Sequence, residues 1–171
     1  MEFSHCGVGF ITSLNQTSSH QILEKGLLGL KNVEHRGGSS DSGELGDGAG
    51  ILTNIPFEFL GIDNSCAVAS LFAPTKDERY KQSIEIFEKT FSQFGLFIES
   101  YREVPINISA VGKRARASVP KMVHAIIKRP GHCRTLTSFD ELLYKATQMV
   151  RTNQRKQGIP SEFFFTSLSS R

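Results

Sequence analysis

The stretch Cys6-Gly7-Val8-Gly9-Phe10-Ile11, near the start of the chain, is the part of the sequence on which the predicted fold and function depend most. Its small and apolar residues predict a short strand over residues 7–12. If the leader Met1–His5 is removed, Cys6 becomes the first residue, and its thiol lies beside its own α-amino group. One residue would then supply both a nucleophile and the base that activates it.

The pKa values of these two groups suit that partnership. A free α-amino group has a reference pKa near ~7.7–8.0, so roughly a tenth of it is unprotonated at neutral pH. A thiol, with a pKa near ~8.5, needs a base or positive surroundings to become the reactive thiolate. A retained leader acylates the amine, so we expect the uncleaved chain to be an inactive precursor. The alternative is that Cys6 is a small apolar residue packed in a strand.

Two more motifs follow Cys6. Glu34-His35-Arg36-Gly37 comes after a helical segment, and Gly46-Asp47-Gly48-Ala49-Gly50-Ile51 comes after a glycine-rich loop. In this order the three motifs resemble the class II glutamine amidotransferases, most nearly the amidotransferase domain at the start of the glutamate synthase large subunit. The resemblance covers essentially the whole chain. It continues in three later segments: Arg102-Glu103-Val104-Pro105, Ala115-Arg116-Ala117-Ser118-Val119-Pro120 and Ser167-Leu168-Ser169-Ser170-Arg171.

The resemblance assigns roles to particular side chains. Cys6 would be the nucleophile, and Arg36 with Gly37 would form the Arg-Gly element beside it. A guanidinium is permanently charged, so it favours the thiolate and orders the loop around it. Asp47 and Gly48 would belong to the loop that packs against the nucleophile segment.

Other interpretations of these residues stay open. Arg36 could instead form a surface ion pair with Glu34 or Asp47. His35 either helps to position the Arg-Gly turn or is an ordinary loop histidine. The segment Gly46–Gly50 could be mistaken for a phosphate-binding loop, but it is not G-x-G-x-x-G and has no P-loop lysine.

Hydrophobic periodicity predicts alternating strands and helices along the chain. Gly26 and Gly29 weaken the first helix and would let it lie close to a sheet. Capping-box spacing places Ser18, Thr75 and Ser138 at the starts of the three long helices, with Gln21, Glu78 and Glu141 as their partners. We expect strands over residues 7–12, 50–55, 66–72, 96–104, 122–128 and 162–167, and helices over residues 19–32, 56–60, 76–94 and 138–156.

This order indicates a layered protein of helices and strands. The resemblance implies an α+β fold, the four-layer αββα sandwich of N-terminal-nucleophile hydrolases with two antiparallel sheets face to face. It also implies a leader over residues 1–5 and an amidotransferase domain over residues 6–171, incomplete at its C-terminus. Family members carry an Asn-Gly oxyanion pair further on, and this sequence has no Asn-Gly. We therefore expect the N-terminal portion of a longer protein, inactive by itself.

The length, hydrophobic content and cysteine count of the chain exclude some classes of protein. The 171 residues, 39% of them hydrophobic, suffice for one compact domain, and no apolar run is long enough to span a membrane. Three widely spaced cysteines argue against a disulfide framework and for the cytoplasm. Cys66, in an apolar segment, is expected in the core. Cys133 is an alternative nucleophile only if Cys6 is never exposed.

The charge is distributed unevenly. Residues 1–112 hold 8 Lys and Arg against 14 Asp and Glu, whereas residues 113–171 hold 12 against 3. Lys113-Arg114-Ala115-Arg116 is the densest basic segment and invites a nucleic-acid interpretation. No aromatic residues are interleaved with it, so a solvated or subunit-facing surface is favoured. A metal site from His5-Cys6 and His132-Cys133 is disfavoured, because no pair has metal-ligand spacing.

The resemblance also implies a reaction. The chain would hydrolyse the side-chain amide of glutamine through a cysteine thioester, and the ammonia would serve glutamate biosynthesis in a downstream synthase domain. In the longer family proteins that domain uses FMN and an iron–sulfur cluster, with electrons from a reductase subunit or ferredoxin. We expect no cofactor, metal, nucleic acid or membrane partner for this chain. The alternative is a non-catalytic fragment that acts as an interaction or regulatory module.

Overall fold

The computed structural model describes residues 7–15, 17–37, 46, 48–158 and 163–171, apart from the side chain of Arg36. The chain divides into two compact units. The first unit comprises Met1–Asn54 with Ile108–Ala117, and the second comprises Ile55–Asn107 with Ser118–Arg171.

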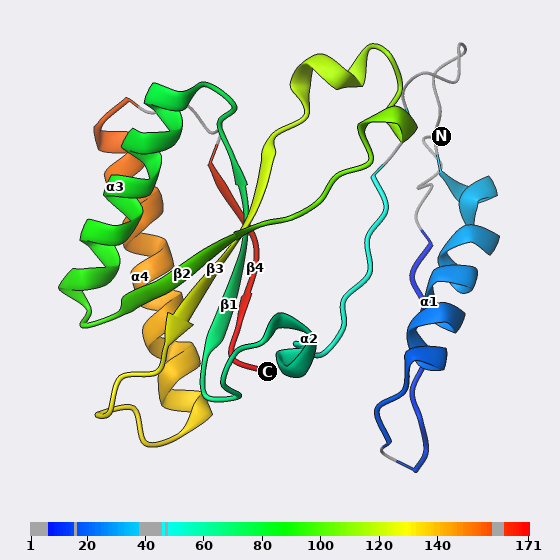
Figure 1. Ribbon diagram of the computed structural model, residues 1–171, viewed down its shortest axis with the longest axis horizontal. Coiled ribbons are helices and arrows are strands. Elements are labelled where there is room, and N and C mark those ends of the chain that lie inside the picture. Colours follow the sequence, from blue (N-terminus) through cyan, green and yellow to red (C-terminus); the bar gives the residue numbers. More distant parts are fainter. Residues whose placement is uncertain (1–6, 16, 38–45, 47, 159–162) are drawn as a thin grey trace, which may run out of the picture. The chain divides into compact units, whose positions relative to one another are not determined.

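The second unit is built on a four-stranded antiparallel sheet with strand order β2-β3-β1-β4 (Figure 1). Ala69 on the inner strand β1 lies opposite Ala125 of β3 and opposite Leu168 of β4. The register shifts once in each edge strand, where an irregularity interrupts the ladder. The strands are β1 (Ala67–Ala73), β2 (Phe97–Glu103), β3 (Lys121–Lys128) and β4 (Phe164–Ser169).

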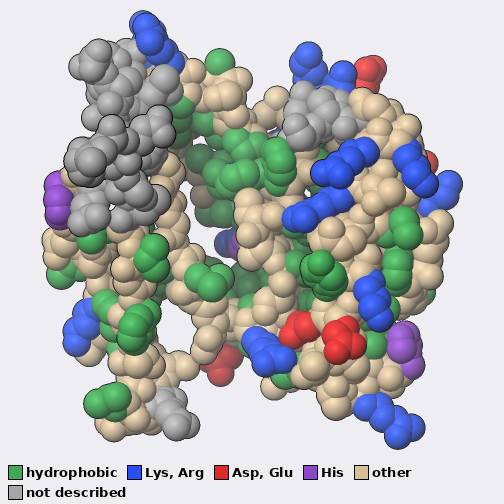
Figure 2. Space-filling model, turned by 180° about the vertical axis from the view of Figure 1, so that it is seen from behind, with side chains coloured by type: hydrophobic (Ala, Val, Ile, Leu, Met, Phe, Trp, Pro, Cys, Tyr) green, Lys and Arg blue, Asp and Glu red, His purple; other side chains and the backbone are tan. Residues whose placement is uncertain are grey.

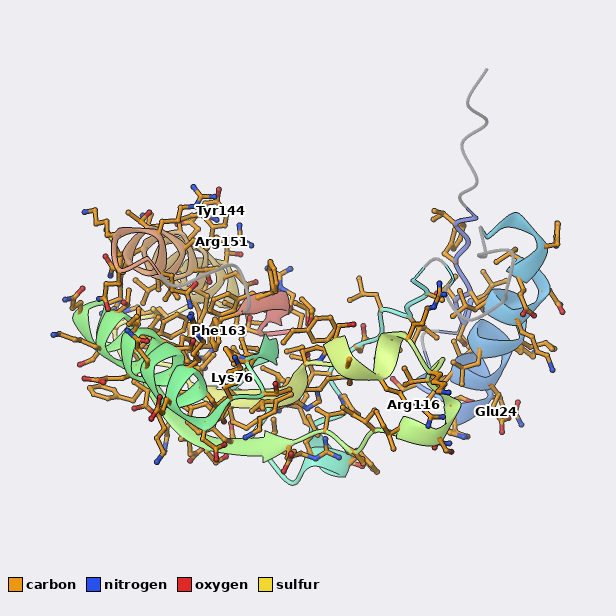
Figure 3. All side chains as sticks on the ribbon, turned by 90° about the horizontal axis from the view of Figure 1, so that it is seen from above. Glu24, Lys76, Arg116, Tyr144, Arg151 and Phe163 are labelled. Atoms are coloured by element: carbon orange, nitrogen blue, oxygen red, sulfur yellow. The ribbon has the colours of Figure 1, made fainter. Side chains whose placement is uncertain are left out.

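Two helices, α3 (Asp77–Gln93) and α4 (Leu136–Lys156), cover one face of this sheet (Figure 1). Their apolar faces meet the inward side chains of β1 and β3 in one buried cluster. Phe87 of α3 is its centre, with ring centroids 4.4 Å from Phe91 and 5.5 Å from Phe165. Phe163 lies between the helices and the sheet, whereas Tyr144 and Arg151 point outward from α4 (Figure 3). The main hydrophobic core of the second unit therefore lies on one face of its sheet.

The opposite face of the sheet is covered less completely. The short helix α2 (Phe57–Leu60) and its flanks pack against a small cluster made by Cys66, Val68 and Ile126. Phe97 and Phe164, at the two edges, are 66% and 49% exposed.

The first unit contains α1 (His20–Asn32) and the 3-10 turns η1 (Glu34–Arg36), η2 (Ile108–Ala110) and η3 (Ala115–Ser118), the last of which ends in the second unit. None of the residues of α1 is fully buried. No helix in the described part of the chain has both the length and the low polarity needed to cross a bilayer.

Most predicted elements are confirmed with small shifts of their bounds. The three long helices, the short helix and four of the six strands are present. Gly95 ends α3 with a φ of 68°, a left-handed conformation that favours glycine. Helices and an antiparallel sheet packed on each other give an α+β arrangement, as the resemblance implied.

Two predicted strands are wrong. Residues 7–12 and 50–55 form no strand. Their apolar side chains are exposed instead: Val8 is 99% exposed, Phe10 92% and Leu52 88%. An apolar pattern shows which side chains favour burial, but a strand also needs a hydrogen-bonded neighbour, and these segments have no ladder in the described residues.

The predicted capping boxes need correction as well. Ser19, not Ser18, caps α1, and its hydroxyl accepts a hydrogen bond of 3.1 Å from the Gln21 amide. The helix α4 begins one turn earlier than predicted, with Thr135 as its cap. Ser138 is the reciprocal partner there, since Thr135 Oγ1 accepts from its amide at 3.1 Å. No side chain caps α3, which begins after Lys76.

Two side-chain predictions are also corrected. The helical spacing of residues 138–156 predicts that Met149 faces inward, but Met149 is 40% exposed and Leu143 is buried on that helix. The three adjacent residues Phe163-Phe164-Phe165 predict a buried strand, but Phe164 is half-exposed. Successive side chains of a strand point to opposite faces, so one of three adjacent phenylalanines must leave the helix-covered side.

We predict that Phe87→Ala destabilises the second unit severely. The substitution removes a fully buried ring with aromatic neighbours in α3 and β4, and such changes cost about 3–5 kcal/mol. Phe164→Ala, at a half-exposed ring, is the matched control. Urea unfolding of both variants measures the difference. Equal losses of unfolding free energy would contradict the one-sided core.

We also predict that His124 makes stability depend on pH. Its Nδ1 is buried and has no hydrogen-bond partner in the described residues. Burial, and secondarily the charge of Arg102, lower the pKa of His124 below its usual value. The unfolded chain then binds a proton that the folded chain resists. Neutral His124 therefore contributes to the free energy of unfolding above the unfolded pKa of about 6.5, and this contribution is lost as the pH falls through the folded pKa.

Urea unfolding of wild type and of His124→Gln, at about pH 7.5 and about pH 5.5, tests this dependence. The wild type should lose more unfolding free energy on acidification than the variant does. The control is His132→Gln, at an exposed position of the same unit. A pH dependence that is reduced equally in both variants would contradict the assignment.

Candidate active site

The structure describes only part of the predicted site. Cys6 and Asp47 lie outside the described residues, as does the side chain of Arg36. The backbone of the Arg-Gly element, with Gly37 and Gly48, is described. The geometry therefore concerns the residues that flank the proposed nucleophile.

The segment that follows Cys6 begins against the end of α1. A Cβ placed on Gly7 would lie only 3.1 Å from the Cβ of Val33. Val33 is the C-cap of α1 and comes directly before the Glu34-His35-Arg36-Gly37 motif. The residue after Cys6 therefore lies beside the start of the second motif, although 26 positions separate Gly7 from Val33 (33 − 7 = 26).

Local hydrogen bonds fix the second motif to the helix. The Val33 amide donates to the carbonyl of Leu30 at 3.3 Å, and the Gly37 amide donates to the carbonyl of Glu34 at 2.9 Å. His35 Nδ1 lies 3.1 Å from the carbonyl oxygen of Asn32. A carbonyl can only accept, so this ring nitrogen must carry the proton. His35 thus ties the Arg-Gly turn to the last turn of α1.

The third motif also ends against α1. A Cβ placed on Gly26 would lie 3.0 Å from Cδ1 of Ile51, the residue that closes Gly46-Asp47-Gly48-Ala49-Gly50-Ile51. Gly26 therefore allows a close approach, but to residue 51, which lies in no strand, and not to a sheet as predicted. Gly29 has open space at the same test and does not share this role. One helix thus contacts the segments that carry all three motifs.

Two residues of this arrangement could not be identified from the sequence. Nothing in the pattern distinguished Val33 from other aliphatic residues near a helix end. Ile51 was part of a quoted motif, but its contact with Gly26 depends on the fold. The only available signal was Gly26 itself, because a glycine inside a helix costs about 1 kcal/mol and needs a compensating contact.

The remaining cysteines are poor nucleophiles. Cys66 is 1% exposed, and its thiol lies 3.8 Å from the Glu99 carboxylate. Burial, and secondarily the negative charge of Glu99, raise the pKa of Cys66, which keeps the thiol protonated. Cys133 is 6% exposed and packs in the main core. Neither thiol is open to a substrate in this structure.

The basic segment is engaged in its own loop. The guanidinium of Arg116 donates to the carbonyls of Val111, at 2.9 Å, and Ser109, at 3.3 Å (Arg116 is labelled in Figure 3). Lys and Arg side chains are spread over the visible surface rather than gathered in one patch (Figure 2). The hydrogen bonds of Arg116 give this one side chain a structural role within its own loop.

Other kinds of site receive no support. A shallow hollow of about 360 Å³ on α1 is lined by Gln21, Glu24, Lys25 and Leu28, none of which belongs to a motif. Within the described ranges, no three His, Cys, Asp or Glu residues are grouped as metal ligands would be.

The sequence of the chain matches the model of a known family. The model of the family "Glutamine amidotransferases class-II" matches residues 6–171. The chain therefore belongs to the class II glutamine amidotransferases.

The relatives specify which members of that class are similar. The chain is 30% identical over 176 residues to ferredoxin-dependent glutamate synthase 1 of Arabidopsis thaliana. It is 31% identical over 183 residues to the large chain of NADPH glutamate synthase of Azospirillum brasilense, and 29% over 182 residues to that of Bacillus subtilis. These alignments cover 96%, 99% and 99% of this chain, but 11%, 12% and 12% of the relatives' lengths. The chain is thus homologous to a small part of each glutamate synthase.

We predict that neutral His35 carries its proton on Nδ1. The hydrogen bond to the Asn32 carbonyl requires this tautomer, which is the minor one in free histidine. Two-bond nitrogen–proton correlation spectra at about pH 8, well above the usual histidine pKa, distinguish the tautomers. The comparison is exposed His132, whose ring makes no such hydrogen bond to any residue that the structure describes. An Nε2-protonated His35 would show that the ring does not hold the turn.

Proposed function

We propose that this chain is the glutaminase part of a glutamate synthase-like protein, and that Cys6 is its nucleophile once Met1–His5 is removed. The observation that carries the proposal is the family match over residues 6–171, whose first position is Cys6. The contact between Gly7 and Val33 supports it, because it joins the segment after Cys6 to the Arg-Gly turn.

The proposed reaction uses the two groups of one residue in turn. The α-amine accepts the thiol proton as the sulfur attacks the side-chain carbonyl carbon of glutamine. The same amine then donates that proton to the leaving nitrogen, and ammonia departs. A γ-glutamyl thioester remains on Cys6. Water, activated by the amine, hydrolyses the thioester, so glutamate is released and the thiol is restored.

The other motif residues have supporting roles in this proposal. Arg36 supplies a fixed positive charge that favours the thiolate, and Gly37 lets the Arg-Gly turn approach the nucleophile. A Cβ on Gly37 would already lie 3.3 Å from the Glu34 carbonyl oxygen, so a side chain there would disturb the turn. Asp47 and Gly48 belong to the loop that packs against the nucleophile segment.

The four-layer αββα sandwich belongs to the same proposal. One face of the described sheet is covered by α3 and α4, and the opposite face carries Val68, Ile126 and the half-exposed Phe164. An apolar sheet face of this kind suits a second antiparallel sheet. We propose that residues 6–171 form part of such a domain and that residues 1–5 are a removable leader.

The wider reaction is proposed from the relatives. In a glutamate synthase-like protein, a synthase domain would use the ammonia for glutamate biosynthesis in the cytoplasm, with FMN, an iron–sulfur cluster and electrons from a reductase subunit or ferredoxin. Iron–sulfur clusters are held by grouped cysteine thiolates. Cys66 and Cys133 lie in different apolar clusters, so the described residues do not fit such a group.

A non-catalytic interaction or regulatory module is the competing function. The observation in its favour is that the 171 residues contain no Asn-Gly pair, the element that forms the oxyanion hole in this family. Losing one oxyanion donor costs about 2.7–4 kcal/mol of transition-state stabilisation. Glutamine hydrolysis would therefore need oxyanion hydrogen-bond donors other than an Asn-Gly pair from these 171 residues.

We predict that, in a protein that joins this chain to the rest of a glutamate synthase large subunit, Cys6→Ala abolishes both ammonia release from glutamine and covalent labelling by the glutamine analogue 6-diazo-5-oxo-L-norleucine. The substitution removes the only sulfur that the proposal places at the substrate. Intact-mass spectrometry should show the labelled wild-type protein beginning at Cys6. Cys133→Ala is the control and should still be labelled. A protein that retains Met1 and takes no label would support the non-catalytic module instead.

A further inference from the structure

We propose that Gly7 and Val33 form a size-matched pair that positions Cys6 for attack, with Val33 acting as a positioning residue. This inference rests on the proposed function, because it assumes that Cys6 is the nucleophile. It adds a residue outside the sequence motifs to the set that determines reactivity.

The space around Gly7 is filled by Val33. A Cβ on Gly7 would meet three atoms of that side chain, Cβ at 3.1 Å, Cγ2 at 3.3 Å and Cγ1 at 3.6 Å. The first of these distances is shorter than ordinary contact between carbon atoms, which is about 3.5–4.0 Å. Any side chain at position 7 would therefore have to displace Val33 or the backbone of its own segment.

Backbone conformation does not explain the glycine. Positive φ angles, at which other residues are strained, occur in the described glycines only at Gly61, Gly95 and Gly158. Gly7 is thus needed for space and not for conformational freedom. Gly9, two residues further on, has neither a positive φ nor any atom within 4 Å of a Cβ placed on it. Of these two glycines, only Gly7 is sterically required.

Val33 cannot easily yield to a larger neighbour. It caps the C-terminus of α1, and its amide donates to carbonyls of the last turn, those of Leu30 and Lys31. Its β-branched side chain has few rotamers. The hydrogen bonds of His35 and Gly37 hold the turn that follows. A clash would therefore move the segment of Gly7 rather than the helix end.

A displacement of Gly7 reaches the nucleophile directly. Consecutive Cα atoms are about 3.8 Å apart across one rigid peptide unit, so Cys6 must follow a shift of its neighbour. Misplacement of a reacting group by about 1 Å can cost about 100-fold in rate. The pair therefore controls the position of the thiol relative to a substrate, without touching the substrate.

The experiment compares Gly7→Ala, Val33→Gly and the double variant in a protein that joins this chain to the rest of a glutamate synthase large subunit, with Gly9→Ala as the matched control. A site-specific protease frees Cys6 in every variant, so that differences in leader removal do not enter. Two probes are used on each protein. The glutamine-shaped 6-diazo-5-oxo-L-norleucine reports a positioned thiol, and iodoacetamide, which needs no binding site, reports thiol exposure and ionisation. Thermal unfolding is followed in parallel.

We expect Gly7→Ala to lower the rate of labelling by the glutamine analogue about 10- to 100-fold. The iodoacetamide rate should change by less than about threefold, since a positioning effect leaves exposure and ionisation nearly intact. Gly9→Ala should behave like wild type. Val33→Gly in the Gly7→Ala background should restore at least about half of the logarithm of the rate that Gly7→Ala loses, because it removes all three atoms that the new Cβ would meet.

The failures are distinguishable. If the glutamine analogue never labels the wild-type protein with a free Cys6, joined to the rest of the large subunit, the proposed function is overturned and this inference with it. A labelled wild type with equal rates in Gly7→Ala and Gly9→Ala overturns this inference alone. The inference is also overturned if Val33→Gly does not rescue Gly7→Ala. It is overturned as well if the rates of both probes fall together with the unfolding temperature, which would indicate loss of structure only.

Discussion

Burial of a single sheet face beneath α3 and α4 is the constraint on which the second unit depends. A four-stranded antiparallel sheet can bury its apolar side chains on one face and leave the other open to a second layer. Here the rings of Phe87 and Phe91 on α3 contact aromatic rings at the last strand, β4. These rings belong to Phe163 and Phe165, so α3 fixes the position of β4. Because these contacts join segments far apart in sequence, the helices and the sheet must form together.

The sequence predicted the elements of this unit well because their signals are local. The phenylalanine spacing of α3, the stop at Gly95 and the apolar run of β1 each act within a few residues. Helix starts were less predictable, since Ser138 and Thr135 are both capping residues and only the backbone decides between them. Residues 7–12 and 50–55 were assigned to strands wrongly, because an apolar pattern cannot show whether a partner strand is present.

For the candidate site, the sequence suggests a chemistry but does not show which contacts hold the motifs in place. Residue types and their order were enough to suggest Cys6, the Arg-Gly turn and the glycine-rich loop. The contacts that place their flanks on α1, through Val33 and Gly26, depend on distances between residues that are far apart in the chain. The two glycines lower the stability of α1, but one of them, Gly26, lets Ile51 pack closely against the helix. In this unit the missing side chain of Gly26 therefore leaves the space that Ile51 occupies.

The account's central claim is that the thiol of an N-terminal Cys6 forms the acyl intermediate. The most direct measurement uses a protein that joins this chain to the rest of a glutamate synthase large subunit. It is mixed with glutamine, the reaction is stopped in acid, and the acylated peptide is identified by mass spectrometry. The account predicts a peptide that begins at Cys6 and carries one γ-glutamyl group on sulfur, with the α-amine free. Ammonia release without that peptide, or with the acyl group on Cys133, would contradict it.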